Sequence, residues 1–87
     1  MEERDKTENG IELHLSINPV VLRMMPSPPA GRLILAEGST LQDLLERIGL
    51  SARSSRLLLS VNERVVARTT PLSDGDRVMI MPILGGG

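Results

Sequence analysis

A single segment of the chain has the periodicity of an amphipathic helix, and this restricts the folds open to the sequence. Its apolar residues recur at spacings of three and four, which places them on one helical face: Leu41, Leu44, Leu45 and Ile48. Ser39 and Gln42 stand at capping-box spacing, with Thr40 as a competing N-cap. Gly49 follows where a left-handed residue commonly ends a helix.

Most of the remaining apolar segments predict strands. Ile11–Ile17 alternates apolar and polar residues with a period of two, which is typical of a half-buried strand. Val20–Met25 fits either a hairpin strand or one helical turn, whereas the proline-rich Pro26–Gly31 predicts a loop. Turns are expected at Asn62-Glu63 and at Asp74-Gly75. The expected strands are Ile11–Ile17, Arg32–Ala36, Arg56–Val61, Arg64–Ala67 and Arg77–Ile83.

One helix combined with four or five strands predicts an α+β fold. The helix must lie across one face of a mixed sheet, because only this arrangement buries both apolar stripes. Ser51–Ser55 is expected to be a polar connection. We expect residues 1–10 to form a disordered arm, 11–84 the folded domain and 85–87 a flexible glycine tail.

The residue types that the chain lacks argue against several kinds of function. It contains no cysteine, and the single histidine, His14, alternates with apolar residues as a solvated strand residue would, so neither a nucleophile–base set nor a metal site is expected. Ten basic residues against eleven acidic ones, with no aromatic side chain, argue against nucleic-acid binding. No apolar run approaches the ~20 residues that span a membrane, so we expect a cytoplasmic protein. Because the usual catalytic residue types are missing, we expect that the protein is not an enzyme.

Three stretches of sequence resemble the ThiS/MoaD family of sulfur carriers, which are ubiquitin-like proteins with a β-grasp fold. They are EGSTLQDLLERIGL, LLLSVNERVV and PLSDGDRVMIMPILGGG. The resemblance implies that an adenylating enzyme of the ubiquitin-activating type, which uses ATP, activates the C-terminal glycine, Gly87. The glycine then becomes a thiocarboxylate, with sulfur from a partner's persulfide. The carrier itself binds no cofactor.

The resemblance also implies an acceptor of the sulfur, and here two pathways remain open. The acceptor is thiazole synthase in thiamine biosynthesis or the large subunit of molybdopterin synthase. The triple-glycine ending favours thiamine slightly, whereas Pro82 followed by two apolar residues favours molybdopterin. A ubiquitin-like modifier joined to lysines and a plain β-grasp binding module are the alternative functions.

The glycine tail is suited to entering another protein's active site. Gly85, Gly86 and Gly87 have no Cβ, so this segment fits a narrow channel. Residues 83–87 extend roughly 16 Å at ~3.3 Å per residue. Ordering such a tail costs on the order of 1–2 kcal/mol per residue, so a docking surface elsewhere must offset the cost. A flexible linker is the alternative interpretation.

The last strand is the expected docking surface. If Val78 and Ile80 face the helix, Met79 and Met81 face the open side of the sheet. Methionine suits a surface that meets several partners, because it is flexible and polarizable. An alternative is that both methionines only cover the small domain. The expected docking residues are Met79, Met81, Ile83 and Leu84. Three arginines are expected on the strands nearest the tail, either as simple surface charge or as contacts to acidic partners: Arg64, Arg68 and Arg77.

Overall fold

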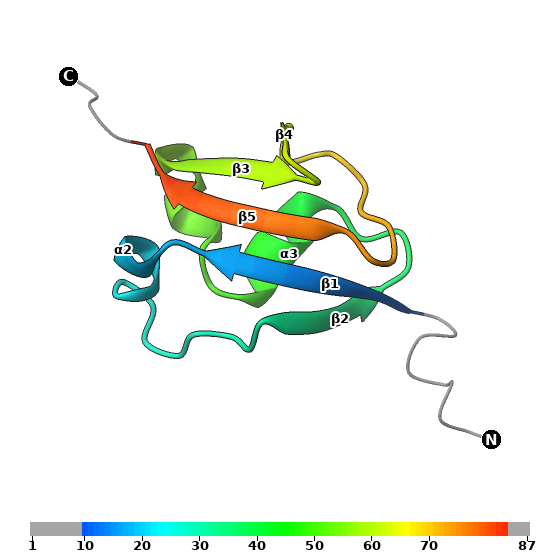
Figure 1. Ribbon diagram of the computed structural model, residues 1–87, viewed down its shortest axis with the longest axis horizontal. Helices are drawn as coiled ribbons and strands as arrows, with labels where there is room; N and C mark the ends of the chain where they lie inside the picture. The colour runs from blue at the N-terminus through cyan, green and yellow to red at the C-terminus, as the bar shows by residue number, and fades with distance from the viewer. Residues whose placement is uncertain (1–9, 84–87) are drawn as a thin grey trace.

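The computed structural model describes residues 10–83, apart from the side chains of residues 53 and 54 (Figure 1). Its elements follow the expected order, with two short helical segments added. They are β1 (Gly10–Ile17), α2 (Pro19–Leu22), β2 (Arg32–Ala36), α3 (Leu41–Arg47), the 3-10 helix η1 (Ser51–Arg56), β3 (Leu57–Val61), β4 (Arg64–Val65) and β5 (Arg77–Pro82).

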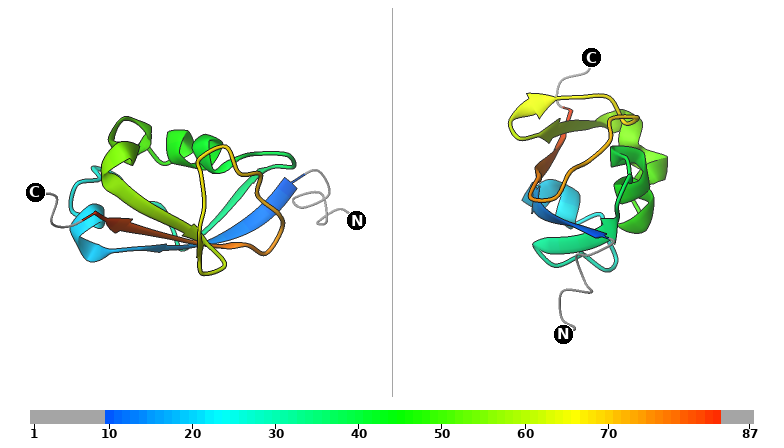
Figure 2. Two further views of the ribbon diagram at one scale, coloured as in Figure 1. Left: turned by 90° about the horizontal axis from the view of Figure 1, so that it is seen from above. Right: turned by 90° about the vertical axis from the view of Figure 1, so that its right-hand side faces the viewer.

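Within residues 10–83 the strands form one mixed sheet in the order β2-β1-β5-β3-β4. The two central strands, β1 and β5, are parallel, and the other neighbours are antiparallel. The helix α3 lies across one face of this sheet and leaves the other face open (Figure 2). The predicted α+β arrangement, a mixed sheet packed on one main helix, is therefore confirmed, with five strands.

The core lies between α3 and the covered face of the sheet. It consists of aliphatic side chains and Met25, since the chain has no aromatic residues. Leu41, Leu44 and Leu45 of α3 are buried, and Ile48 packs against the core from the end of the helix. The predicted helical stripe is thus the face that packs on the sheet. The strands contribute Ile11, Leu13, Leu35, Leu57, Leu59, Val61, Val78 and Ile80.

The ends of α3 confirm one expectation and correct another. Thr40, and not Ser39, is the N-cap: its side chain accepts a hydrogen bond from the Asp43 N–H, and the Asp43 carboxylate accepts one from the Thr40 N–H at 2.9 Å. Ser39 instead donates its hydroxyl to the Ala36 carbonyl, which closes the preceding turn. Gly49 has a φ of 82°, as expected for the residue that ends the helix.

The segment that the sequence left open forms a helical turn. Pro19 occupies the first turn of α2, where its missing N–H costs nothing, and the Asn18 side chain accepts from the Val20 N–H at 2.8 Å. The predicted polar connection Ser51–Ser55 forms the 3-10 helix η1, which continues through Arg56, so the next strand begins at Leu57 and not at Arg56 as predicted. Gly10, assigned to the N-terminal arm from sequence, is the first residue of β1.

Both predicted turns form, and they are joined to each other. Asn62 and Glu63 have positive φ values of 52° and 72°, the combination that a two-residue type I′ hairpin requires. Asn62 donates its amide to the Asp76 carboxylate at 2.8 Å, and Asp74 accepts from the Glu12 N–H at 2.7 Å. The VN and DGD sequences therefore tie the start of β5 to β1 and to the β3–β4 turn. None of the helices in the described part of the chain is long and apolar enough to span a membrane.

Candidate functional site

The end of β5 fixes where the glycine tail starts. The strand ends at Pro82, and the Ile83 N–H donates to the Arg56 carbonyl at 3.0 Å, so Ile83 is still held beside β3. Leu84 and the three tail residues, Gly85, Gly86 and Gly87, lie outside the described residues. Their predicted roles stay predictions. The part of the domain from which the tail departs, where β5 ends, is termed the tail end of the sheet.

The open face carries both methionines of β5, as predicted. Val78 and Ile80 are buried against α3, whereas Met79 on the opposite face is 38% exposed and Met81 is partly exposed. In the strand register Met81 lies opposite Leu58 of β3. Together with the exposed Val65 of β4, these side chains form an apolar surface, the open-face patch: Leu58, Val65, Met79 and Met81.

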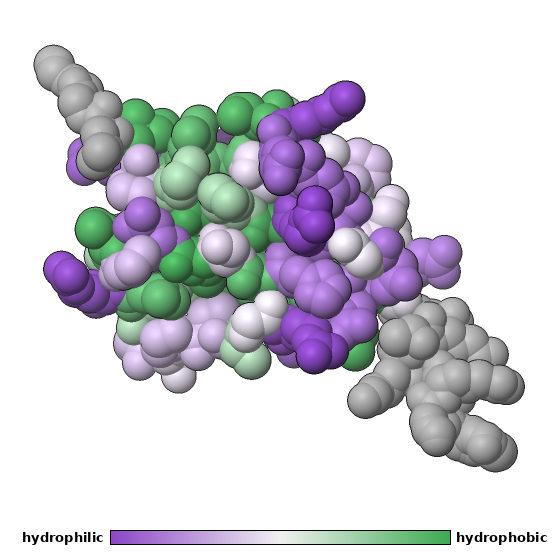
Figure 3. Space-filling view, in the orientation of Figure 1, coloured by the Kyte–Doolittle hydropathy of each residue, from purple (hydrophilic) through white to green (hydrophobic). Residues whose placement is uncertain are grey.

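The apolar surface is confined to one part of the open face. Figure 3 shows hydrophobic residues gathered over the tail end of the sheet and hydrophilic residues over the opposite end. The hydrophilic part includes His14, which is exposed as expected, and a surface ion pair between Arg32 and Glu12 at 3.1 Å. Such exposed pairs contribute little stability, about 0–1 kcal/mol. The apolar contact surface of the open face therefore extends from the tail end as far as Val65 of β4, and the hydrophilic part lies outside it.

Two hollows meet at the last described residues, Pro82 and Ile83. One, of about 390 Å³, opens beside the open-face patch and is lined by Asn18, Leu58 and Met81 as well. The other, of about 380 Å³, lies between α2 and η1 and is termed the α2–η1 pocket. Besides Pro82 and Ile83 it is lined by Val20, Met24, Ala52, Ser55, Arg56 and Leu57.

Exposed apolar side chains surround Ile83. Ile83 itself is 53% exposed, Val20 50% and Met24 41%. A monomeric domain gains nothing from leaving three large apolar side chains in water at one place, so a cluster of this kind marks a contact surface. Ile83, predicted as a docking residue, therefore lies within an exposed apolar cluster, and its role in docking stays a prediction.

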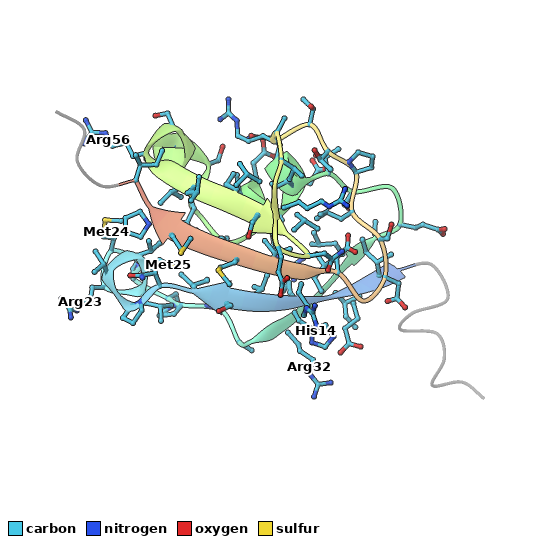
Figure 4. The ribbon with its side chains drawn as sticks, turned by 45° about the horizontal axis from the view of Figure 1, so that its top comes forward. His14, Arg23, Met24, Met25, Arg32 and Arg56 are labelled. Carbon is cyan, nitrogen blue, oxygen red and sulfur yellow. The ribbon has the colours of Figure 1, made fainter. Side chains whose placement is uncertain are left out.

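The arginines near the tail are not those predicted from the sequence. Arg77 begins β5 and Arg64 begins β4, at the opposite end of the sheet. The Arg68 carbonyl accepts from Gln42 at the start of α3, which is also far from the tail. The prediction was wrong because β5 carries its first residue about 16 Å from its last, at ~3.3 Å per residue. Instead, Arg56 and Arg23 stand beside the tail end (Figure 4).

Sequence reasoning missed the contribution of α2 and η1 to this site. Val20 and Met24 occur in a segment without clear period, and Arg56 was assigned to a strand. The only signal was the apolar content of VVLRMM, too short to bury all of its side chains in any regular element. Their proximity to Ile83 depends on long-range pairing of β1 and β5, which places the start of α2 beside the end of β5.

Comparison with known proteins agrees with this architecture. A model of the ThiS family matches residues 28–87. Two solved structures are similar in fold. A putative molybdopterin converting factor, subunit 1, from Pyrococcus furiosus has a TM-score of 0.65 and 19% identity over 85% of this chain and 99% of its own. SAMP1 from Haloferax volcanii has a TM-score of 0.55 and 14% identity over 90% of this chain and 99% of its own.

The two structural similarities and the family match support different conclusions. At identities of 19% and 14% the two structures support the fold alone, and they confirm the predicted ubiquitin-like β-grasp arrangement. The family match spans most of the chain, and it runs through the last strand and the glycines. None of the curated protein sequences compared with the chain matches it.

Proposed function

The chain belongs to the ThiS family, and we propose on that basis that it is a sulfur carrier protein whose terminal glycine becomes a thiocarboxylate. The observation that carries the proposal is the family match through residue 87, which includes the tail. The apolar surfaces on both sides of Ile83 support it, because a tail substrate needs a docking surface around its base. In this role the protein is a co-substrate of another enzyme.

The chemistry proceeds in two stages at the carboxyl group of Gly87. An activating enzyme directs the carboxylate onto the α-phosphorus of ATP, which forms an acyl-adenylate and expels pyrophosphate. A persulfide sulfur of a partner then attacks the carbonyl carbon and displaces AMP. A second thiol cleaves the resulting S–S bond, forming a disulfide with the partner's cysteine and leaving the thiocarboxylate on the glycine.

The folded domain contributes positioning. Because Ile83 is hydrogen-bonded to the Arg56 carbonyl, the docked domain fixes the origin of the tail. Residues 84–87 then have to span only about 13 Å at ~3.3 Å per residue to place the carboxylate. Leu84 is proposed to add apolar contact where the tail enters the partner, in addition to that of the open-face residues Met79 and Met81. Gly85 and Gly86 provide clearance in the channel.

ATP–pyrophosphate exchange with the adenylating enzyme from the same organism tests the proposal. The full chain should support exchange, and deletion of Gly86-Gly87 should abolish it while the thermal unfolding transition stays unchanged, because a glycine tail buries almost no apolar area. Gly86→Val should also fail, since a β-branched side chain adds bulk and stiffens the backbone. Exchange at the full rate by the protein that lacks both glycines would refute the carrier function.

Mass spectrometry of the intact protein distinguishes the carrier from its alternatives. After expression with the sulfur-relay enzymes, replacement of one terminal oxygen by sulfur is expected. Conjugates with other proteins would favour the modifier, and an unchanged mass without adenylation would favour a plain binding module. Sulfur transfer to thiazole synthase or to the molybdopterin synthase large subunit assigns the pathway, for which we propose thiamine ahead of molybdopterin on the triple-glycine sequence.

A further inference from the structure

Charge is unevenly distributed along the sheet. No aspartate or glutamate occurs in residues 13–36, 47–62 or 77–83, the ranges that include the segments of the tail end. The described acidic residues other than Glu46 of α3 belong to the opposite end of the sheet, its turns and the start of α3: Glu12, Glu37, Asp43, Glu63, Asp74 and Asp76. Among the described residues, the pocket at the tail end is therefore lined by a basic side chain, Arg56, and by no acidic one.

Two arginines whose side chains the structure describes supply positive charge here, one on each side of the α2–η1 pocket. Arg56 lines the pocket, and Arg23 is the C-cap of α2, next in sequence to the lining residue Met24. Both side chains are exposed, and within residues 10–83 neither takes part in an ion pair. Figure 4 shows Arg56 and Met24 on opposite sides of the place where the chain leaves β5.

The pocket between these arginines has room for one side chain of a partner. Its volume of about 380 Å³ and its lining by Val20, Met24 and Leu57 suit an aliphatic group. Any protein that encloses the tail has to cover Ile83, which also lines this pocket. Contact at the tail base therefore brings the partner over the two arginines, where a basic partner surface would be repelled and an acidic one attracted.

We propose that the α2–η1 pocket is a second docking surface for the activating enzyme, which inserts an aliphatic side chain flanked by carboxylates that face Arg23 and Arg56. This inference rests on the proposed carrier function and adds the chemistry of the partner surface. The pocket lies on the other side of Pro82 and Ile83 from the open-face patch. The enzyme thus contacts the domain on both sides of Pro82 and Ile83, and these two contacts fix the direction in which the tail leaves the domain.

Charge-reversal variants test the inference, with the KM for the carrier in ATP–pyrophosphate exchange as the readout. Arg56→Glu and Arg23→Glu should each raise KM about tenfold or more, and leave the rate at saturation unchanged. Arg64→Glu is the matched control, because it changes the same charge on an exposed residue that pairs with the buried Val61 and so lies on the other side of β4 from Val65 of the open-face patch. Its KM should stay within about twofold of the wild-type value.

A second pair of variants separates charge from lost apolar contact. Met24→Asp and Met24→Lys remove the same partly exposed side chain from the pocket but add opposite charges. The aspartate variant should have the higher KM by about tenfold, and the difference should shrink as salt is raised. Unfolding curves that match the wild type would show that these exposed positions leave the fold intact.

The outcomes separate this inference from the function on which it rests. Normal exchange by the wild type, with Arg23→Glu and Arg56→Glu indistinguishable from it, would overturn the acidic docking surface and leave the carrier function standing. Equal losses for Arg23→Glu, Arg56→Glu and Arg64→Glu would also overturn it, because net charge alone would then be responsible. No exchange by the saturating wild type would instead reject the carrier function.

Discussion

Two adjacent residues of β5 offer the sharpest test of the open-face patch. Ile80 is 0% exposed beneath α3, whereas Met79, on the other side of the same strand, is 38% exposed. Met79→Asp and Ile80→Asp introduce the same charge one residue apart. If the faces are assigned correctly, the first variant should lose binding to the activating enzyme and keep its fold, and the second should lose the fold.

The expected destabilisation depends on where each carboxylate would lie. At position 80 the substitution removes buried apolar contact worth about 2–5 kcal/mol and adds an unpaired buried charge costing several more. The whole domain has a stability of only about 4–13 kcal/mol, for 87 residues at ~0.05–0.15 kcal/mol each, so Ile80→Asp should be largely unfolded. Met79 lies between Ser16 and Ser60 in the register, where the carboxylate stays hydrated and costs about 1 kcal/mol.

The binding loss at position 79 has two sources. Docking would bury the exposed third of Met79, worth roughly 0.5–1 kcal/mol of the ~1.5–3 kcal/mol for a full methionine. A carboxylate there would also have to lose water without a partner, at a cost of about 1–3 kcal/mol. Together these raise the dissociation constant about tenfold or more.

Urea denaturation followed by circular dichroism measures the free energy of unfolding of each variant. Titration with the activating enzyme measures its dissociation constant. Ser16→Asp is the control for charge alone, since Ser16 is exposed opposite Met79 but contributes no apolar side chain. A Met79→Asp variant that unfolds would show that the strand faces are reversed. Unchanged binding by a folded Met79→Asp would remove the open-face patch from the docking surface.

Three further predictions concern the fold that presents the site. Leu45→Ala should lower the free energy of unfolding by about 2–5 kcal/mol in urea melts, because Leu45 is fully buried; a loss near that of the exposed control Glu46→Ala would contradict the packing of α3. Thr40→Ala should cost about 0.5–2 kcal/mol through loss of the N-cap, whereas Ser39→Ala should cost clearly less; equal effects would argue against the capping box. Glu63→Gly should increase the free energy of unfolding by up to ~1 kcal/mol and so raise the thermal unfolding midpoint, since Glu63 has a φ of 72° and glycine adopts this conformation without strain. A lower midpoint would count against the type I′ turn.

The local sequence pattern was sufficient to predict most of the helices and strands. The spacing of Leu41, Leu44 and Leu45 identified α3, and the alternation in Ile11–Ile17 identified β1, because one face of each is buried. Residues 32–36 were assigned to a strand with the bounds that β2 has. The sequence alone did not decide which residue caps α3, since adjacent Ser39 and Thr40 both have a suitable hydroxyl. Which of them caps depends on the turn that brings Asp43 to Thr40.

The sequence by itself also determined which residues of β5 share a face, and its motifs indicated the family that the match over residues 28–87 confirms. Only the tertiary structure decided what surrounds the tail. Side-chain alternation is a local property of period two, whereas strand order and direction depend on pairing between distant residues. The parallel pairing of β1 with β5 carries Arg77 to the far end of the sheet and brings α2, with Val20 and Met24, beside Ile83. For this reason the methionines of β5 could be placed on the open face from the chain alone, but the pocket and the two arginines near Ile83 could not.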